Sequence, residues 1–249
     1  MTVSAAERLK TNQVGYMQAV DRPIHFSTEL FYPPFPLKTP VLQKLYYDLS
    51  RVPAAAYESA DFGMPGPPRF YSRRANNAQS IALFLPDRLV VIEEWVDLPF
   101  ERFLERVREV AERTLDAFEI GAFAAQTAVI RTTFALTHFN DARVFLIDHI
   151  CGLEDRLGPF FGRPVGVGGI RFVFPPVPNH PGELHLIIES YRHSMNEVFV
   201  EAKTVYPDEE ITLKGMEKAG ENIIRVRRFI SENVYPFLQQ FDAAPTADN

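Results

Sequence analysis

A hairpin that leads into a long amphipathic helix, between residues 77 and 120, constrains the fold of this chain most strongly. Two apolar runs of high β propensity, Ser80 to Leu85 and Leu89 to Trp95, flank the turn-forming sequence Pro86-Asp87-Arg88. From Phe100 to Phe118 apolar residues recur at helical spacing, with charged residues between them. The pattern predicts two antiparallel strands followed by a helix that packs through one face and exposes the other.

The ends of this helix can also be predicted. Asp97 stands before Leu98-Pro99, and an acidic cap followed by a proline in the first turn is typical of a helix start. Gly121 is expected to end the helix, because glycine accepts the left-handed conformation of a C-cap. The charged residues between the apolar positions, Arg106 among them, are expected to face solvent.

The chain before the hairpin adds a strand, a helix, a loop and a second strand. Alternating residues predict a strand from Arg22 to Tyr32, and Thr39-Pro40 begins a helix whose apolar stripe runs to Leu49. Prolines and glycines make Val52 to Pro68 loop-like. Arg69 to Arg74 is predicted as a short strand.

The chain after Gly121 repeats this order. A strand, a helix, a short strand, a hairpin and a long helix follow one another, and Pro236 is expected to kink or end the last helix. The predicted bounds are Ala125 to His138, Asn140 to about Cys151, Gly166 to Phe174, Glu183 to Tyr191 with Asn196 to Tyr206, and Glu217 to Phe241. The two series are offset by roughly a hundred residues, and the repeat lies in the order of the elements, since residue identity between the halves is poor.

These elements predict an α+β fold, a mostly antiparallel sheet with long helices on one face. One interpretation is a duplicated β-α-β-β-β-α unit, similar in element order to the saddle-like fold of the TATA-binding protein, a similarity that implies no function. The other is two unrelated α+β halves. The halves, residues 22–121 and 122–241, are expected to share one sheet, with an N-terminal arm over 1–21 and a disordered tail over 242–249.

The charge balance argues against nucleic acid as a partner. The chain carries 26 Lys and Arg against 32 Asp and Glu, a formal charge of −6 and a sequence pI near 5.6. A polyanion partner usually requires a basic surface. Arg225, Arg227 and Arg228 stand close together, but Glu221 and Glu232 are near them, so one solvated helix face is the better interpretation.

The sequence also bears on the compartment. Cys151 is the only cysteine, which excludes an intrachain disulfide and is typical of a reducing compartment; we expect its thiol to be buried. No run approaches the roughly 18 apolar residues that span a bilayer, and residues 1–12 lack the features of a signal peptide. We expect a cytoplasmic protein that does not bind membranes.

The most notable polar cluster is His185, Glu189 and His193 in the sequence ELHLIIESYRHSMNE. On a helix these three groups would stack on one face and could bind zinc. On the strand that we predict, four residues cover about 13 Å, too far for neighbouring members to share one metal ion. A solvated face or groove lining is therefore favoured, and a site completed by other strands is the alternative.

The same spacing makes this side of the sheet a candidate contact surface. Tyr191 lies on the side of the polar residues, while Leu184, Leu186 and Ile188 point the other way, towards the helices. The first hairpin, with Trp95 at its end, places apolar side chains on both faces. Aromatic residues anchor interfaces, although an ordinary exposed face is equally consistent. The candidate ligand-binding residues are His185, Glu189, Tyr191, His193 and Trp95.

Catalytic chemistry receives little support. The motifs GxSxG and HExxH and paired CxxC are absent. Cys151 has Asp148 and His149 nearby, but neighbours on a helix point in different directions, and catalytic triads are assembled from distant positions. We expect no catalytic residue, no metal and no cofactor.

Two stretches carry a resemblance to a known family. The sequence PDRLVVIEEW followed by a helix, and VFVEAKTVYPDEE followed by a long C-terminal helix, resemble a sporadically distributed, uncharacterised bacterial family of similar length. The resemblance covers the chain from Arg22 onward. It implies no catalytic residues.

The sequence thus favours a non-enzymatic protein that binds another protein, or itself, through the sheet face or an unpaired sheet edge. The alternative is a small-molecule-binding protein or hydrolase with a pocket between the two halves. That pocket would use His185, Glu189 and His193, together with His138.

Overall fold

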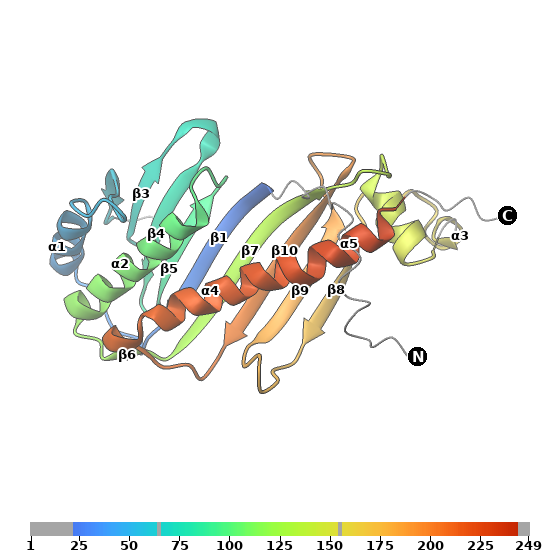
Figure 1. Ribbon diagram of the computed structural model, residues 1–249. Helices are drawn as coiled ribbons and strands as arrows, with labels where there is room; N and C mark the ends of the chain where they lie inside the picture. The colour runs from blue at the N-terminus through green and yellow to red at the C-terminus, as the bar shows by residue number, and fades with distance from the viewer. Residues whose placement is uncertain (1–21, 64–65, 154–155, 244–249) are drawn as a thin grey trace, which may run out of the picture.

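The computed structural model describes residues 22–63, 66–153 and 156–243. Nine strands form one sheet in the order β2-β3-β4-β5-β1-β7-β10-β9-β8, and every neighbouring pair is antiparallel (Figure 1). The strands are β1 Arg22–Phe31, β2 Ser59–Asp61, β3 Arg69–Arg73, β4 Gln79–Leu85, β5 Arg88–Glu94, β7 Ala125–Ala135, β8 Gly169–Phe174, β9 Glu183–Ser190 and β10 Glu197–Tyr206. A separate pair joins β6 (Ala122–Phe123) to β11 (Ile211–Thr212). The predicted α+β class with a mostly antiparallel sheet is confirmed.

The sheet order is symmetric about its central pair. Outward from β1 lie β5, β4 and β3, and outward from β7 lie β10, β9 and β8. Both series also follow the same chain order, because in each half the central strand comes first and the outermost of these strands comes next. β3 and β8 therefore hold equivalent places, and the two halves share one sheet.

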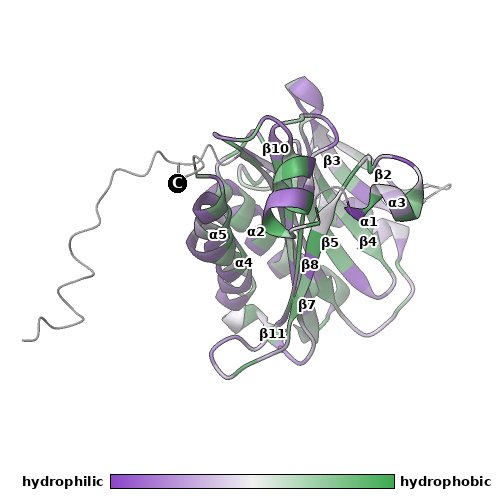
Figure 2. Cartoon of the chain, turned by 90° about the vertical axis from the view of Figure 1, so that its right-hand side faces the viewer, coloured by the Kyte–Doolittle hydropathy of each residue, from purple (hydrophilic) through white to green (hydrophobic). Residues whose placement is uncertain are grey.

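Long helices cover one face of this sheet. They are α2 (Phe100–Phe118) and a continuous run of α4 (Glu217–Phe229), the π-helical segment η6 (Ile230–Val234) and α5 (Tyr235–Phe241). Figure 2 is seen from the β8 end and shows α2, α4 and α5 on the same side of the sheet. Alternate strand residues point into the core beneath them, and fully buried examples are Leu30, Phe84, Ile188 and Val200. The opposite side is called the open face below.

Three shorter helices complete the ordered structure. α1 (Thr39–Leu49) packs on α2 through Leu42, Leu45 and Leu49, and its start at Thr39-Pro40 is as predicted. The expected helix from Asn140 to Cys151 is instead a π-helical segment, η3, at Val144–Ile150, and α3 (Gly158–Phe161) follows it. The remaining turns are the 3₁₀ segments η2 (Ala75–Asn77) and η5 (Leu213–Gly215).

Three local predictions about the helices and their ends are wrong, and a fourth holds in at most one of its alternatives. α2 has no side-chain cap, because the Asp97 carboxylate binds Arg74 instead. The left-handed residue at its end is Glu119, with φ of 56°, and not Gly121. Of the two outcomes predicted for Pro236, a kink or an end, the end does not occur, because Pro236 lies in the first turn of α5 directly after the π-helical segment η6. The side chain of Cys151 is exposed, not buried.

The described chain also differs from the predicted bounds at two loops. β2 forms inside the stretch from Val52 to Pro68 that was predicted to be a loop. β8 begins at Gly169, not at Gly166, and a Cβ at Gly169 would lie 2.4 Å from the Ile188 carbonyl oxygen.

The predicted terminal segments are only partly described. Asp242, the first residue of the predicted tail, is buried and accepts hydrogen bonds from the N–H groups of Thr137 and His138. The predicted arm over 1–21 and the tail from 244 lie outside the described residues. No helix within the described ranges has the length and apolar character that a membrane crossing needs.

Candidate functional site

The segment with two of the three predicted ligands, His185 and Glu189, is extended. Leu186 and Ile188 of β9 are buried under the helices, with 4% and 0% of their surface exposed. His185 and Glu189 alternate with them and therefore lie on the open face. The predicted strand is confirmed from Glu183 to Ser190, and His185 and Glu189 lie on it. His193 lies in the turn that follows, so the prediction that it shares the strand face with them is wrong.

His185 makes its polar contacts within the second half. Its Nε2 lies 2.6 Å from the Glu183 carboxylate, and its Nδ1 lies 3.3 Å from the Arg171 guanidinium on β8. The cross-strand neighbours of His185 are Lys203 on β10 and Val173 on β8. His185 thus belongs to a row of charged side chains with mutual partners.

Tyr191 and His193 lie just beyond the end of β9 and contact each other. Their rings are 5.2 Å apart at 68°, and the Tyr191 ring also stacks on Phe199 at 6.4 Å. Both line a hollow of about 350 Å³, whose wall includes the Asp141–Arg143 ion pair at 2.6 Å. All residues that line this hollow belong to the second half, so it is not the predicted pocket between the halves.

Trp95 and His138 lie away from these residues. Trp95 follows β5, is 48% exposed and has φ of 49°. Since β1, β7 and β10 lie between β5 and β9, about 19 Å separates the backbone of β5, which Trp95 follows, from that of β9, which Tyr191 follows. The Nδ1 of His138 is 2.9 Å from the backbone oxygen of Asp242, near the end of α5. The proposed histidine pocket is therefore not assembled.

Metal binding has no geometric support in the part of the chain that the structure describes. Within 22–63, 66–153 and 156–243, no three His, Cys, Asp or Glu side chains are grouped so that they could hold a metal ion. His185 and Glu189 are separated by the rise of the strand, as the sequence indicated.

The most unusual feature of the sheet is β8, the outer strand of the second half, because it is an exposed apolar strand at the edge. It is six residues long, and most of its side chains are exposed. Phe172, Val173 and Phe174 show 37%, 51% and 41% of their surface. Phe172 and Phe174 point to the helix side, where the Phe174 ring meets Phe229 of α4 at 5.7 Å, and Val173 points to the open face. An apolar strand at the edge of a sheet is a template for another strand.

The backbone of β8 has free hydrogen-bonding groups. The Ser190 N–H donates to the Gly168 carbonyl at 2.9 Å, which makes this a hydrogen-bonded pair of the β8–β9 ladder. Such pairs alternate in antiparallel sheets, so Arg171 and Val173 turn their N–H and C=O groups away from β9. No described strand pairs with that side of β8.

The equivalent strand of the first half is covered. β3 has the same alternation of inward and outward backbone groups. The Phe84 N–H donates to the Pro68 carbonyl at 2.9 Å, so Arg69 and Tyr71 turn their N–H and C=O groups away from β4. There β2 pairs with it, with Asp61 opposite Arg69 and Ser59 opposite Tyr71. The place that β2 occupies beside β3 is the place left open beside β8.

No family model matches this chain, and no curated protein matches it. The family resemblance inferred from its two stretches thus stays a prediction. The function is therefore inferred from the arrangement of β8.

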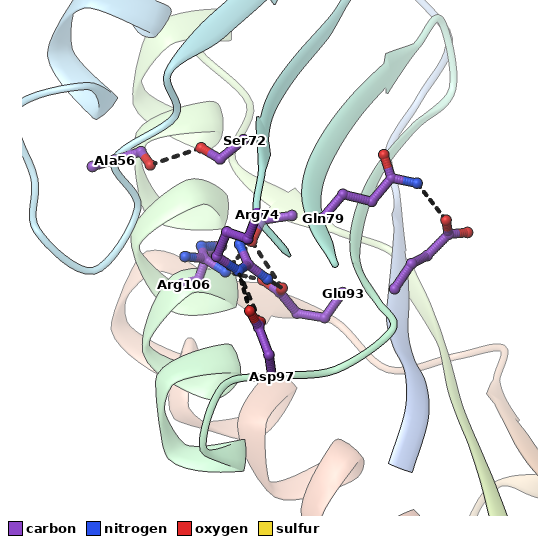
Figure 3. Close-up of polar contacts among 9 residues, drawn as sticks. Ala56, Ser72, Arg74, Gln79, Glu93, Asp97 and Arg106 are labelled. Atoms are coloured by element: carbon purple, nitrogen blue, oxygen red, sulfur yellow. Dashed lines mark hydrogen bonds and ion pairs between the residues drawn. The ribbon is translucent and has the colours of Figure 1, made fainter. Parts of the chain in front are cut away.

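A buried ionic cluster supports the covered end of the sheet, and the sequence did not reveal it. Glu93 on β5 has no exposed surface, and its carboxylate binds the guanidinium groups of Arg74 and Arg106 and the Ser80 hydroxyl (Figure 3). Arg74 also binds Asp97 at 2.8 Å. Burial lowers the pKa of the Arg106 guanidinium. Arg106 was predicted to face solvent, but it lies between α2 and the sheet.

A second buried titratable group stands between the halves. His25 lies on the open face of the central strand β1, yet it is only 9% exposed, and its Nε2 is 2.9 Å from the Ser27 hydroxyl. Burial, reinforced by the Arg131 charge, lowers the pKa of His25 to about 4. The imidazole is therefore neutral at physiological pH.

Proposed function

We propose that this protein is a non-enzymatic binding module that takes a strand of another polypeptide at the free edge of β8. The single observation that carries the proposal is an apolar six-residue edge whose outward N–H and C=O groups have no described partner. Strand addition of this kind takes its affinity from backbone hydrogen bonds and its specificity from alternate side chains. The acidic composition and single cysteine favour a cytoplasmic setting for this activity.

The side chains on the two sides of β8 fit a polypeptide better than a small molecule. Phe172 and Phe174 offer aromatic anchors on the helix side, and Arg171 and Val173 offer a mixed surface on the open face. A small-molecule site is instead a concave pocket that surrounds most of its ligand. β8 offers an extended row of backbone groups at the edge of the sheet, so an extended chain is its natural complement.

Site-specific photocrosslinking in the native host would test the proposal. A photoreactive amino acid at Phe174 is expected to link covalently to a polypeptide, either a different protein or another copy of this chain. The same probe at Tyr47, which is 53% exposed on α1, serves as the control for random contact. Equal labelling at the two positions would contradict the proposal.

A variant pair separates strand addition from other contacts. Val173→Pro removes an outward N–H that β9 does not use, whereas Val173→Thr keeps it. We expect the crosslinked product at position 174 to disappear in the proline variant and to remain in the threonine variant. Retention of the product in both would exclude backbone pairing as its cause.

The equivalence of β3 and β8 also leads us to infer that the halves are a duplicated unit. Its support is the symmetric sheet order together with the same order of elements along the chain. On this interpretation the first half supplies its own outer strand, β2, and the second half receives one from outside.

The hollow at Tyr191 and His193 supports a second candidate function, the binding of a small polar molecule. Its volume of about 350 Å³ is in the range of small ligand sites, and Arg143 and His193 lie in its wall. Thermal-shift screening of metabolites against the wild type and His193→Ala would test it, since stabilisation by a true ligand should be lost in the variant. Equal shifts in both proteins would count against this site.

A further inference from the structure

We propose that the strand added at β8 is β8 of a second copy, so that two chains form a continuous sheet about a two-fold axis. This inference rests on the proposed function and names its partner. The observation behind it is the sequence of the free edge strand β8, GIRFVF, whose outward residues can pair with those of a second copy in an antiparallel register.

The outward backbone groups limit the possible registers. Residues that face outward must pair with residues that face outward, so Arg171 and Val173 of one copy must lie opposite Gly169, Arg171 or Val173 of the other. A two-fold pairing centred on Phe172 meets this condition. It places Arg171 opposite Val173 of the second copy, and Val173 opposite Arg171 of the second copy.

The side chains favour this register over its neighbours. Centring on Arg171 would put two guanidinium groups directly opposite each other, which is unfavourable. Centring on Val173 would bring Arg171 opposite Pro175 of the second copy, which has no N–H to donate. With Phe172 at the centre, the two Phe172 rings meet on the helix side, and Ile170 lies opposite Phe174 of the second copy.

The register can be tested by disulfide formation. In this arrangement Phe172 and its copy form a non-hydrogen-bonded pair with Cα atoms about 4.5 Å apart, which a disulfide can bridge. Because Cys151 is exposed, the test uses full-length protein with Cys151→Ser. Phe172→Cys in this background is expected to form a covalent dimer under mild oxidation in more than about half of the chains.

Two further variants serve as controls. Val173→Cys should give less than about a tenth of that dimer, because its neighbour across the axis is Arg171 and not Val173. The double variant Arg171→Cys with Val173→Cys should restore it. Equal cross-linking of the two single variants would overturn the register.

Light scattering after size exclusion, from micromolar to millimolar concentration, tests the dimer itself. Val173→Pro should weaken dimerisation at least about tenfold, because the symmetric pair loses two hydrogen bonds, while Val173→Thr should change it by less than about threefold. A wild type that stays monomeric throughout would overturn the inference of self-pairing. Photocrosslinking at Phe174 to a different protein would then still support strand addition, so the two proposals fail separately.

Discussion

The two outer edges of the sheet are built in opposite ways. At the first edge, β2 has three residues, carries Asp61 against Arg69 at 3.6 Å, and closes off β3. At the second edge, β8 has six residues, is rich in phenylalanine, and presents backbone groups to solvent. Proteins usually protect edges with short strands and charges, so β2 is a protected edge and β8 is one kept open.

The aromatic side chains of β3 and β8 also differ in how deeply they are buried. Phe70 on β3 has no exposed surface, with Tyr46, Phe62 and Phe84 packed around its ring. Phe172 on β8 is more than a third exposed. The difference shows that the first edge is completed by its own chain, whereas β8 has no described strand on its outer side.

Truncating the two aromatic residues should therefore give the largest contrast. Phe70→Ala is expected to lower the free energy of unfolding by about 3–5 kcal/mol, since it leaves a cavity in the core. Phe172→Ala should cost about 1 kcal/mol or less, because its ring is partly in solvent already. Chemical denaturation of dilute protein measures both, and similar losses at the two sites would refute the contrast.

Removing the buried carboxylate at the protected end should be nearly as damaging. Glu93→Ala would leave Arg74 and Arg106 without their shared counter-charge, at a cost of about 3 kcal/mol. Glu94→Ala is the matched control, because Glu94 is half-buried on the open face and binds only Gln79 among the described side chains. We expect less than about 1 kcal/mol for it, by urea denaturation. Equal effects would mean that the cluster contributes nothing specific.

The central strand between the edges should make stability depend on pH. The pKa of His25 is about 4 in the folded chain and 6.5 in the unfolded one, so the unfolded state binds the additional proton between these values. The contribution of His25 to the free energy of unfolding is present above pH 6.5 and is lost as the pH falls. The loss from pH 7 to pH 5 is about 2 kcal/mol. The His25→Gln variant should flatten that slope. An unchanged slope in the variant would show that other groups cause it.

Proline substitution at the two edges should give the smallest but most selective effects. Tyr71→Pro removes an N–H that faces β2 and should cost about 2 kcal/mol, whereas Val173→Pro should cost less than about 1 kcal/mol in dilute monomer. Thermal unfolding followed by circular dichroism gives both values. A larger loss for Val173→Pro would mean that β8 is not a free edge.

The fold was largely predictable because it follows local patterns. The alternation in β4, β5, β9 and β10, and the apolar stripe of α2, each specify their own structure. Elements that depend on distant partners were not predicted. β2 is an example, because it pairs with β3. The helix expected up to Cys151 was predicted in place, but its π-helical form was not.

The functional features were less predictable for the same reason. Glu93 stands in an apolar strand, and only the fold reveals that Arg74 and Arg106 converge on it. The histidines were visible in the sequence, but His185 lies on β9 and His193 lies in the turn after it. For β8 a signal existed, since Ile170, Phe172 and Phe174 make one face of the predicted strand apolar and Val173 adds an apolar residue to the other. Its position at the edge could not be read from the sequence.

Amide hydrogen exchange, resolved residue by residue, tests the open edge most directly. In dilute protein the N–H groups of Arg171 and Val173 should exchange rapidly, while those of Ile170 and Phe172, which face β9, are protected. Concentrating the protein should slow Arg171 and Val173 selectively, as a second copy pairs with them. Protection of Arg171 and Val173 at high dilution, or rapid exchange of both at every concentration and with every captured partner, would contradict an edge built to accept another strand.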